Sequence, residues 1–295
     1  MTADLVTVDG TNISYKFHRA QHAIKDLPLL VALHGGTYTS EYFNVAGSPA
    51  GSFVEVANRN GFSVVTIDRP GYGTSGHLPD ADNTFARQAE LLDGAIAQIL
   101  PKTGAHSVVL VGHSIGGMIG LEIAARRPAW NLIGISATGC GAIIPTGGPA
   151  EAMAGLPPTG IVDLPQANRD GLMFGPAGSY SAEGLEAAHE SYAPVPAKEL
   201  SNAPAWPRQR LAEVAPKISV PVHNALGEFD ALWETSPKAR ETFVKMFPSN
   251  QRVEAELIEG AGHSIDHHSA GIVVHLKQLA FAHECALLAV TAVSR

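Results

Sequence analysis

Short apolar runs recur along the first half of the chain, and each run ends at a turn sequence. The runs are apolar at nearly every position and rich in Val, Ile and Leu, which is typical of parallel strands buried on both faces. They lie at 29–33, 62–67, 107–111 and 132–136. Helical patterns separate them, at 53–60, 84–100 and 115–127. Strands that alternate with helices predict an α/β fold built on a mostly parallel sheet.

The same alternation returns in the last third of the chain. It consists of two further strand–helix pairs, at 220–226 with 237–247 and at 253–258 with 264–289. The first residues differ, because 5–8 and 13–17 flank the turn sequence Asp9-Gly10-Thr11 and predict an antiparallel hairpin.

The segment 141–215 interrupts this rhythm. It carries 10 of the 20 prolines and 9 of the 30 glycines, contains no clear strand, and offers only short helical candidates at 182–192 and 207–214. A stretch this long is unusual for a plain loop, which leaves a helical lid or an irregular surface excursion. We favour the lid, because the segment begins where a strand ends, and open α/β sheets bind ligands at that edge. The predicted organisation is a core of 1–140 and 216–295 with an inserted cap.

Composition narrows the class of protein. The 295 residues carry a net charge of −8, which disfavours nucleic-acid binding. The longest apolar runs fall short of a membrane helix, and the first residues lack the features of a signal peptide, so a cytoplasmic location and no membrane contact are expected. Cys140 and Cys285 are too few for a disulfide framework, and Cys285 is expected to be a packed thiol.

The turn after the third apolar run has the sequence Gly112-His113-Ser114-Ile115-Gly116. It fits the G-x-S-x-G pattern of a nucleophile on a sharp strand-to-helix turn, and both the strand and the helix are predicted around it. The alternative is a glycine-rich turn whose serine caps the helix. We interpret Ser114 as a candidate nucleophile.

A serine nucleophile needs a base and an acid that orients the base. Enzymes with this turn place them in the order Ser, Asp or Glu, then His. Asp230 follows the run 220–226 and is the candidate acid, whereas Glu228 is expected to be a solvated turn residue. His263 follows the last predicted strand, 253–258, in a loop of small residues, and is the candidate base.

The neighbours of His263 suggest a second hypothesis. His263, Asp266 and His267 have the i, i+3, i+4 spacing that can place metal ligands on one helix face. No other ligand cluster in the sequence accompanies them, so we expect no metal and interpret His267 and His268 as surface residues.

An oxyanion intermediate requires preorganised N–H donors. One is expected from Ile115, which follows the nucleophile, and the other from the loop after the first parallel strand. Gly36 is preferred there because glycine permits close backbone approach, with Thr37 as the fallback. His34 is expected to organise this loop, and the turn at 68–73 to brace the site.

Aromatic and apolar residues in or near the predicted lid are candidates for a substrate pocket, although they could equally pack the lid onto the core. The candidates are Tyr38, Met173, Phe174, Trp206 and Trp233.

Together these motifs resemble the α/β-hydrolase fold superfamily. The resemblance rests on His34-Gly35-Gly36, the turn at 68–73, the Ser114 turn and the Gly262-His263 loop. It implies an eight-stranded, mostly parallel sheet, a mainly helical cap after the sixth strand, and no cofactor. Dehalogenases and epoxide hydrolases of this superfamily carry Asp at the nucleophile position, so Ser114 disfavours both. Its proline-releasing peptidases have an extended His-Gly-Gly-Pro-Gly loop, from which Thr37-Tyr38 departs.

The resulting hypothesis is a serine hydrolase. Ser114 would form an acyl-enzyme with a small to medium, mostly apolar ester, lactone or thioester, with Asp230 and His263 completing the triad. Alternatives are a carbon–carbon bond hydrolase, and a ligand receptor or cofactor-free lyase that keeps the triad without hydrolysing esters. The sequence does not indicate an oligomeric state.

Overall fold

Eight strands form one sheet in the computed structural model, which describes residues 3–44, 52–250 and 252–293. The strand order is β1-β2-β4-β3-β5-β6-β9-β10. β2 runs antiparallel to β1 and to β4, and the remaining neighbours are parallel. The fold class predicted from the sequence is confirmed. The strands are β1 (Asp4–Val8), β2 (Thr11–His18), β3 (Leu29–Leu33), β4 (Val64–Ile67), β5 (Val108–His113), β6 (Leu132–Thr138), β9 (Val222–Gly227) and β10 (Val253–Ile258).

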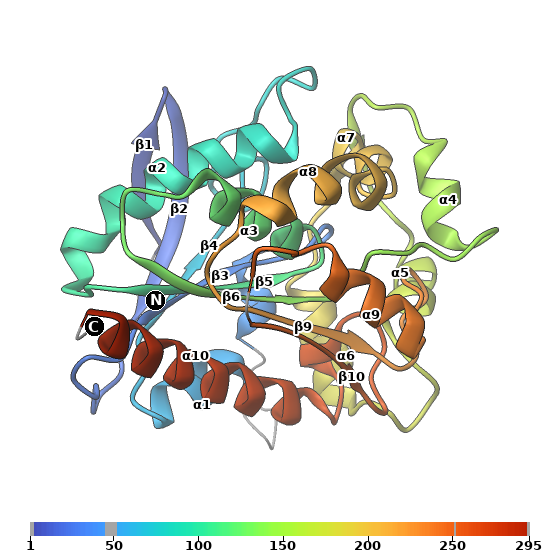
Figure 1. The fold of residues 1–295 in the computed structure, drawn as a ribbon. Helices are drawn as coiled ribbons and strands as arrows, with labels where there is room; N and C mark the ends of the chain where they lie inside the picture. The colour runs from blue at the N-terminus through green and yellow to red at the C-terminus, as the bar shows by residue number, and fades with distance from the viewer. Residues whose placement is uncertain (1–2, 45–51, 251, 294–295) are drawn as a thin grey trace.

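Helices cover both faces of the sheet, as Figure 1 shows. In that view α1 and α10 lie below the sheet, and α2 and α3 lie above it. The central strand β3 supplies side chains to both layers, since Leu29, Val31 and Leu33 join one apolar cluster while Leu30 and Ala32 join the other. This is why the central strands read as continuous apolar runs. The helices are α1 (Phe53–Arg59), α2 (Phe85–Thr103), α3 (Ile115–Arg126), α9 (Pro237–Lys245) and α10 (Gly271–Val293).

The segment between β6 and β9 folds into short helices, most of which lie at the right-hand end of the sheet in Figure 1. The expectation that this segment lacks strands was wrong, because β7 and β8 form an antiparallel pair. Each has only two residues, too few to leave a pattern in the sequence. The elements are α4 (Pro149–Ala154), β7 (Ile161–Val162), α5 (Gln166–Met173), α6 (Ala182–Glu190), β8 (Val195–Pro196), α7 (Ala197–Asn202), a π-helical turn (Pro207–Leu211) and α8 (Ala212–Val214).

The last helix begins later than its pattern predicts. The apolar periodicity starts at residue 264, but α10 begins at Gly271, after a 3-10 turn at Ile265–His267. Of the intervening residues, His268 accepts a hydrogen bond from the Gly262 N–H at 2.9 Å and so holds the loop that follows β10. By length and composition alone α10 could cross a membrane, although only 39% of its most apolar window is buried in the protein. Cys285 is a buried free thiol on this helix, as expected.

Candidate active site

Ser114 lies at the sharp turn between β5 and α3. Its backbone has φ 52° and ψ −121°, a conformation that costs a non-glycine residue free energy. The flanking glycines make the turn possible: a Cβ at Gly116 would lie 2.0 Å from the Leu33 carbonyl oxygen, and one at Gly112 would lie 2.5 Å from the carbonyl oxygen of Gly116. The Ser114 side chain makes no capping hydrogen bond to α3, which argues against the helix-cap alternative.

His263 and Asp230 come to Ser114 from the carboxyl ends of neighbouring strands. Asp230 follows β9 and His263 follows β10. His263 Nε2 is 3.0 Å from Ser114 Oγ, and its Nδ1 is 2.8 Å from Asp230 Oδ2. The other Asp230 oxygen accepts a hydrogen bond from the Leu232 N–H at 2.8 Å. The imidazole is 1% exposed, so packing fixes its orientation. The structure thus brings the three predicted residues into one hydrogen-bonded chain.

Glu228 has a separate place. It is exposed, and its carboxylate accepts a hydrogen bond from the Gly260 N–H at 2.9 Å. It therefore contacts the loop that leads to His263 but does not belong to the hydrogen-bonded chain.

The candidate oxyanion donors lie around the same cavity as Ser114. Gly36, Thr37 and Ile115 all line it. Ile115 is the first residue of α3, where backbone N–H groups have no partner within the helix. A Cβ at Gly36 would lie 3.0 Å from Ile115 Cδ1, so the Ile115 side chain packs directly against this glycine. Thr37 has φ 66°, and its buried hydroxyl oxygen has no hydrogen-bond partner among the described residues.

Arg69, in the turn after β4, holds the loop that carries these donors. Its guanidinium donates to the carbonyl oxygens of His34 and Gly35 at 2.9 and 3.0 Å, and its N–H donates to His34 Nε2 at 3.0 Å. His34 is 0% exposed and organises the loop, as the sequence predicts. The turn at 68–73 also braces the site, as predicted.

Arg69 also binds a residue that sequence reasoning missed. Glu199 on α7 accepts hydrogen bonds from the Arg69 guanidinium at 2.8 and 3.0 Å, from Tyr72 Oη at 2.8 Å and from Gln88 Nε2 at 2.6 Å. Burial opposes the charge on Arg69, but Glu199 outweighs it and the pKa of the guanidinium is raised. Because 130 positions separate Glu199 from Arg69, no local sequence pattern marks the pair.

The histidines that follow His263 are buried, so the expectation of surface residues was wrong. His267 and His268 are 2% and 5% exposed. Asp266 accepts from Tyr42 Oη at 2.9 Å and pairs with His275 Nε2 at 3.0 Å, and His267 Nε2 lies 3.0 Å from the Tyr42 carbonyl oxygen. Asp266 and His267 thus have partners other than His263. Within residues 3–44, 52–250 and 252–293 no group of three His, Cys, Asp or Glu side chains is arranged to hold a metal ion.

Burial and hydrogen bonding set the pKa values of the side chains in this cluster. Burial lowers the pKa of His267 to about 4. It opposes ionisation of Asp266, but the hydrogen bond from His275 lowers that pKa to about 2. His113 stacks on Tyr42 with ring centroids 4.5 Å apart and lies 5.0 Å from the His263 ring. Burial lowers the His113 pKa well below its usual value, so His113 is neutral beside His263.

A cavity of about 50 Å³ opens onto Ser114 between the core and the segment 141–215. Of the predicted pocket residues, Met173 and Trp233 line it. Most of the lining was not predicted, because isolated apolar residues in irregular segments leave no pattern. The cavity is lined by Gly36, Thr37, Ser114, Ile115, Met118, Ile144, Ala150, Met153, Leu164, Met173, Leu200, Ala203, Pro204, Leu232, Trp233 and His263.

The other three predicted pocket residues lie outside this cavity. Tyr38 Oη is 2.9 Å from Ser264 Oγ, and burial raises the pKa of this phenol to about 12. The Phe174 ring packs against Tyr180. Trp206 Nε1 donates to Glu122 on α3. These side chains fasten loops and the cap segment to the core, which was the alternative interpretation for each of them.

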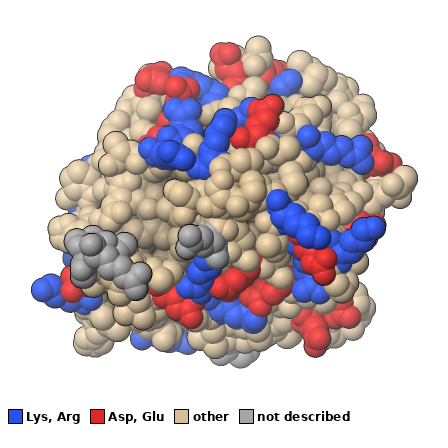
Figure 2. All heavy atoms as spheres, viewed as in Figure 1, with Lys and Arg blue, Asp and Glu red and all other residues tan. Residues whose placement is uncertain are grey.

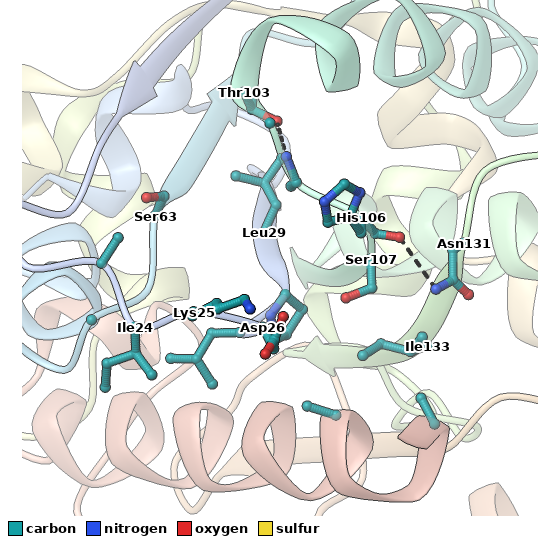
Figure 3. A pocket seen from close by; sticks show the side chains of 18 of the residues that line it. Ile24, Lys25, Asp26, Leu29, Ser63, Thr103, His106, Ser107, Asn131 and Ile133 are labelled. Atoms are coloured by element: carbon teal, nitrogen blue, oxygen red, sulfur yellow. Dashed lines mark hydrogen bonds between the residues drawn. The ribbon is translucent and has the colours of Figure 1, made fainter. Parts of the chain in front are cut away.

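A larger cavity of about 640 Å³ lies at the opposite edge of the sheet (Figure 3). Residues at the amino ends of β3, β5 and β6 line it together with the last part of α10. Two local hydrogen bonds are visible there, from Asn131 to the His106 carbonyl and from the Ala105 N–H to Thr103 (Figure 3). Ser114, Asp230 and His263 do not line this larger cavity, so its size alone does not make it the candidate active site.

The combination of this sheet, the Ser114 turn and the His–Asp pair defines an α/β hydrolase, and comparisons with known proteins agree. The model of the alpha/beta hydrolase family matches residues 30–275. The chain therefore belongs to this family, and the protein is a hydrolase of the α/β fold.

Individual relatives match in part. The mouse sn-1-specific diacylglycerol lipase ABHD11 is 37% identical over 102 residues, which is 35% of this chain and 29% of that protein. The uncharacterized hydrolase YugF of Bacillus subtilis is 30% identical over 124 residues, 41% of this chain and 39% of the relative. The matched segments thus span well under half of these relatives.

Solved structures resemble the whole fold. An esterase from Thermogutta terrifontis has a TM-score of 0.69 at 18% identity, covering 97% of this chain and 100% of that one. The N-acyl homoserine lactonase AidH has a TM-score of 0.69 at 16% identity, covering 97% and 98%.

Proposed function

We propose that this protein is a serine hydrolase that cleaves a carboxylic ester, lactone or thioester of a small to medium, mostly apolar substrate through an acyl-enzyme. The observation that carries the proposal is the hydrogen-bonded chain from Asp230 through His263 to Ser114, with Ser114 opening onto an apolar cavity.

In the first step, Ser114 Oγ attacks the substrate carbonyl carbon. The hydroxyl proton passes to His263 Nε2, which lies 3.0 Å away, and Asp230 stabilises the resulting imidazolium through Nδ1–H. The carbonyl oxygen takes up the negative charge and accepts hydrogen bonds from the Ile115 N–H and from an N–H of the Gly36–Thr37 loop. As the carbon–oxygen or carbon–sulfur bond breaks, His263 returns the proton to the leaving group, and an acyl-enzyme remains.

In the second step, water replaces the leaving group. His263 Nε2 takes a proton from water while the water oxygen bonds to the acyl carbon, again with the charge on the carbonyl oxygen. Collapse of this intermediate breaks the bond to Ser114 Oγ, which recovers its proton from His263. The products are a carboxylic acid and the alcohol or thiol released before, or one hydroxy acid when the substrate is a lactone.

The lining of the cavity supports an apolar acyl group. Apart from the reacting groups, Thr37 and the glycine, it is made of aliphatic, sulfur-containing and aromatic side chains, with no Asp, Glu, Lys or Arg. A charged acyl chain would lose its hydration there without a partner. The structural likeness to an esterase and a lactonase is compatible with this substrate class.

The test combines covalent labelling with a substrate series. We expect a fluorophosphonate to add one adduct at Ser114, detected by intact mass and peptide mapping, and p-nitrophenyl esters to be hydrolysed. Ser114→Ala should lose the adduct and reduce kcat/KM by about 10⁴-fold to 10⁶-fold. A folded wild-type protein that forms no adduct and hydrolyses no ester would overturn the proposal and favour a non-hydrolytic binding protein.

A further inference from the structure

The outer face of α10 carries an apolar stripe. Its inner face packs into the protein through buried residues such as Val274, Phe281 and Cys285. On the outer face, Val273, Leu276, Leu287 and Leu288 are between 45% and 68% exposed, and Ala280 is exposed between them. Helix α10 runs along the lower front of the molecule in Figure 1, and the matching surface in Figure 2 carries both acidic and basic side chains.

The spacing of the stripe is that of a helix that packs against another helix. Val273, Ala280 and Leu287 are seven residues apart, with Leu276 three residues after the first of them and the exposed His283 at the equivalent position after Ala280. Apolar residues at these intervals line one side of a helix along its length and form the seam of a helix pair. At 23 residues, α10 is ~34 Å long, enough for an extended contact.

Two charged residues beside the stripe determine the orientation in which a second helix can pack against this face. Lys277 and Glu284 are also seven residues apart, on either side of Ala280 along the helix. Both lie on one flank of the row formed by Val273, Leu276, Ala280 and Leu287, between this row and Leu288. In an antiparallel pair of identical helices, residues on the same flank face each other across the two-fold axis. An axis close to Ala280 therefore sets Lys277 of each copy against Glu284 of the other.

We propose that α10 is the interface of a symmetric antiparallel dimer, with a second copy of this chain as the partner. The small side chain of Ala280 lets the two helices approach at the axis. Val273 of one copy then meets Leu287 of the other, and two ion pairs, each between Lys277 and Glu284, flank this apolar seam.

The charges favour a protein partner over a lipid surface. Lys277 pairs with Glu256 and Glu284 pairs with Arg252 within one chain, so acidic and basic groups lie together along one edge of the stripe. A mixed polar rim beside an apolar strip is typical of protein interfaces. A helix that lies in a membrane surface instead carries mainly basic residues on its polar side.

The test measures mass in solution by sedimentation velocity over a range of protein concentrations. We expect a reversible dimer for the wild type and a monomer for Ala280→Arg, which places a charge at the axis. Ala97→Arg on the exposed side of α2 is the matched control and should remain dimeric. Circular dichroism and thermal unfolding check that each variant is folded.

Charge reversal tests the antiparallel register. Lys277→Glu and Glu284→Lys should each weaken association at least tenfold, because like charges then meet across the axis, and the double variant should recover most of it. Both reversals disturb contacts within one chain, to Glu256 and Arg252, and the double variant does not repair these. Recovery of the dimer therefore reports on the contact between copies.

Three outcomes would overturn the proposal. The first is a wild type that stays monomeric at about 100 µM, the highest concentration to be tested. The second is a dimer that persists in folded Ala280→Arg, and the third is a double variant in which association does not recover. Binding of a monomeric wild type to phosphatidylcholine–phosphatidylglycerol vesicles, abolished by Ala280→Arg, would assign the face to a membrane instead. Hydrolase activity is measured in parallel, and its absence would leave the dimer result unaffected.

Discussion

Arg69 and Glu199 form a two-pronged ion pair in which both side chains are 0% exposed, with nitrogen–oxygen distances of 2.8 and 3.0 Å. The pair joins two parts of the site. Arg69 holds the carbonyl groups of His34 and Gly35 beside the candidate oxyanion donors. Glu199 lies on α7, and the residue that follows it on this helix, Leu200, lines the cavity.

We expect Glu199→Gln to destabilise the protein by about 3 kcal/mol, because it leaves the Arg69 charge buried without a counter-ion. The free energy of unfolding in urea measures the effect. The exposed pair of Glu241 and Lys245 is the control, since Glu241→Gln should change stability by less than about 0.5 kcal/mol. Equal effects of the two substitutions would contradict a structural role for the buried pair.

Asp230→Asn is expected to reduce kcat/KM for an ester substrate by about 10⁴-fold. An amide in place of the carboxylate no longer requires the proton on His263 Nδ1, so Nε2 is no longer held free to accept the Ser114 proton. Glu228→Gln is the matched control, because its side-chain oxygen still accepts from Gly260 and activity should stay within about threefold. A large loss in Glu228→Gln together with a small loss in Asp230→Asn would assign the acid to Glu228.

Acid should destabilise the protein through buried histidines. Burial lowers the pKa of His267 from 6.5 to about 4, so between these values the unfolded chain binds a proton that the folded protein does not. The stability from neutral His267 is complete above pH 6.5 and is lost as the pH falls towards 4, with about 2 kcal/mol lost between pH 8 and pH 5.

Urea unfolding at pH 8 and pH 5 checks this dependence. His267→Gln should show a smaller loss between the two pH values than the wild type, because its side chain does not titrate. His22→Gln changes an exposed histidine and should keep the wild-type difference. If His267→Gln also keeps the full difference, His267 is not a source of the acid sensitivity.

The cavity should set the acyl length that is accepted. Ala150 on α4 is 5% exposed and lines the cavity, whereas Ala152 on the same helix is exposed. We expect Ala150→Phe to lower kcat/KM for a hexanoyl ester at least tenfold more than for an acetyl ester, because the ring occupies space that the longer chain requires. Ala152→Phe should leave the ratio of the two unchanged, and an equal change in both variants would place the acyl group elsewhere.

The sequence predicts the central sheet and the three hydrogen-bonded residues Ser114, His263 and Asp230 well, because each prediction rests on a short pattern of neighbouring residues. The central parallel strands are continuous apolar runs, and each of Ser114, Asp230 and His263 follows a strand that the sequence predicts. Topology then brings their carboxyl ends together, so the order of the motifs along the chain is enough to place the residues near one another.

The parts that the sequence does not predict depend on contacts between distant segments. Glu199 looks like an ordinary acidic residue on a short helix until Arg69 is placed beside it. His267 and His268 follow the loop that carries His263, and the sequence alone suggests that they lie at the surface. In the structure α6 and the loop around Phe174 cover them. The pocket residues are likewise scattered through short elements, where neither aromatic character nor spacing distinguishes Trp233, which lines the cavity, from Trp206, which does not.

The cavity beside Ser114 has a kinetic consequence. Its accessible space is narrow, about 50 Å³, and residues of α4 and α7 form part of its wall. Under the proposed function, we expect a six-carbon acyl chain to enter when α4 or α7 shifts away from the core. The rate of this shift would limit the turnover number wherever it is slower than the bond making and breaking at Ser114.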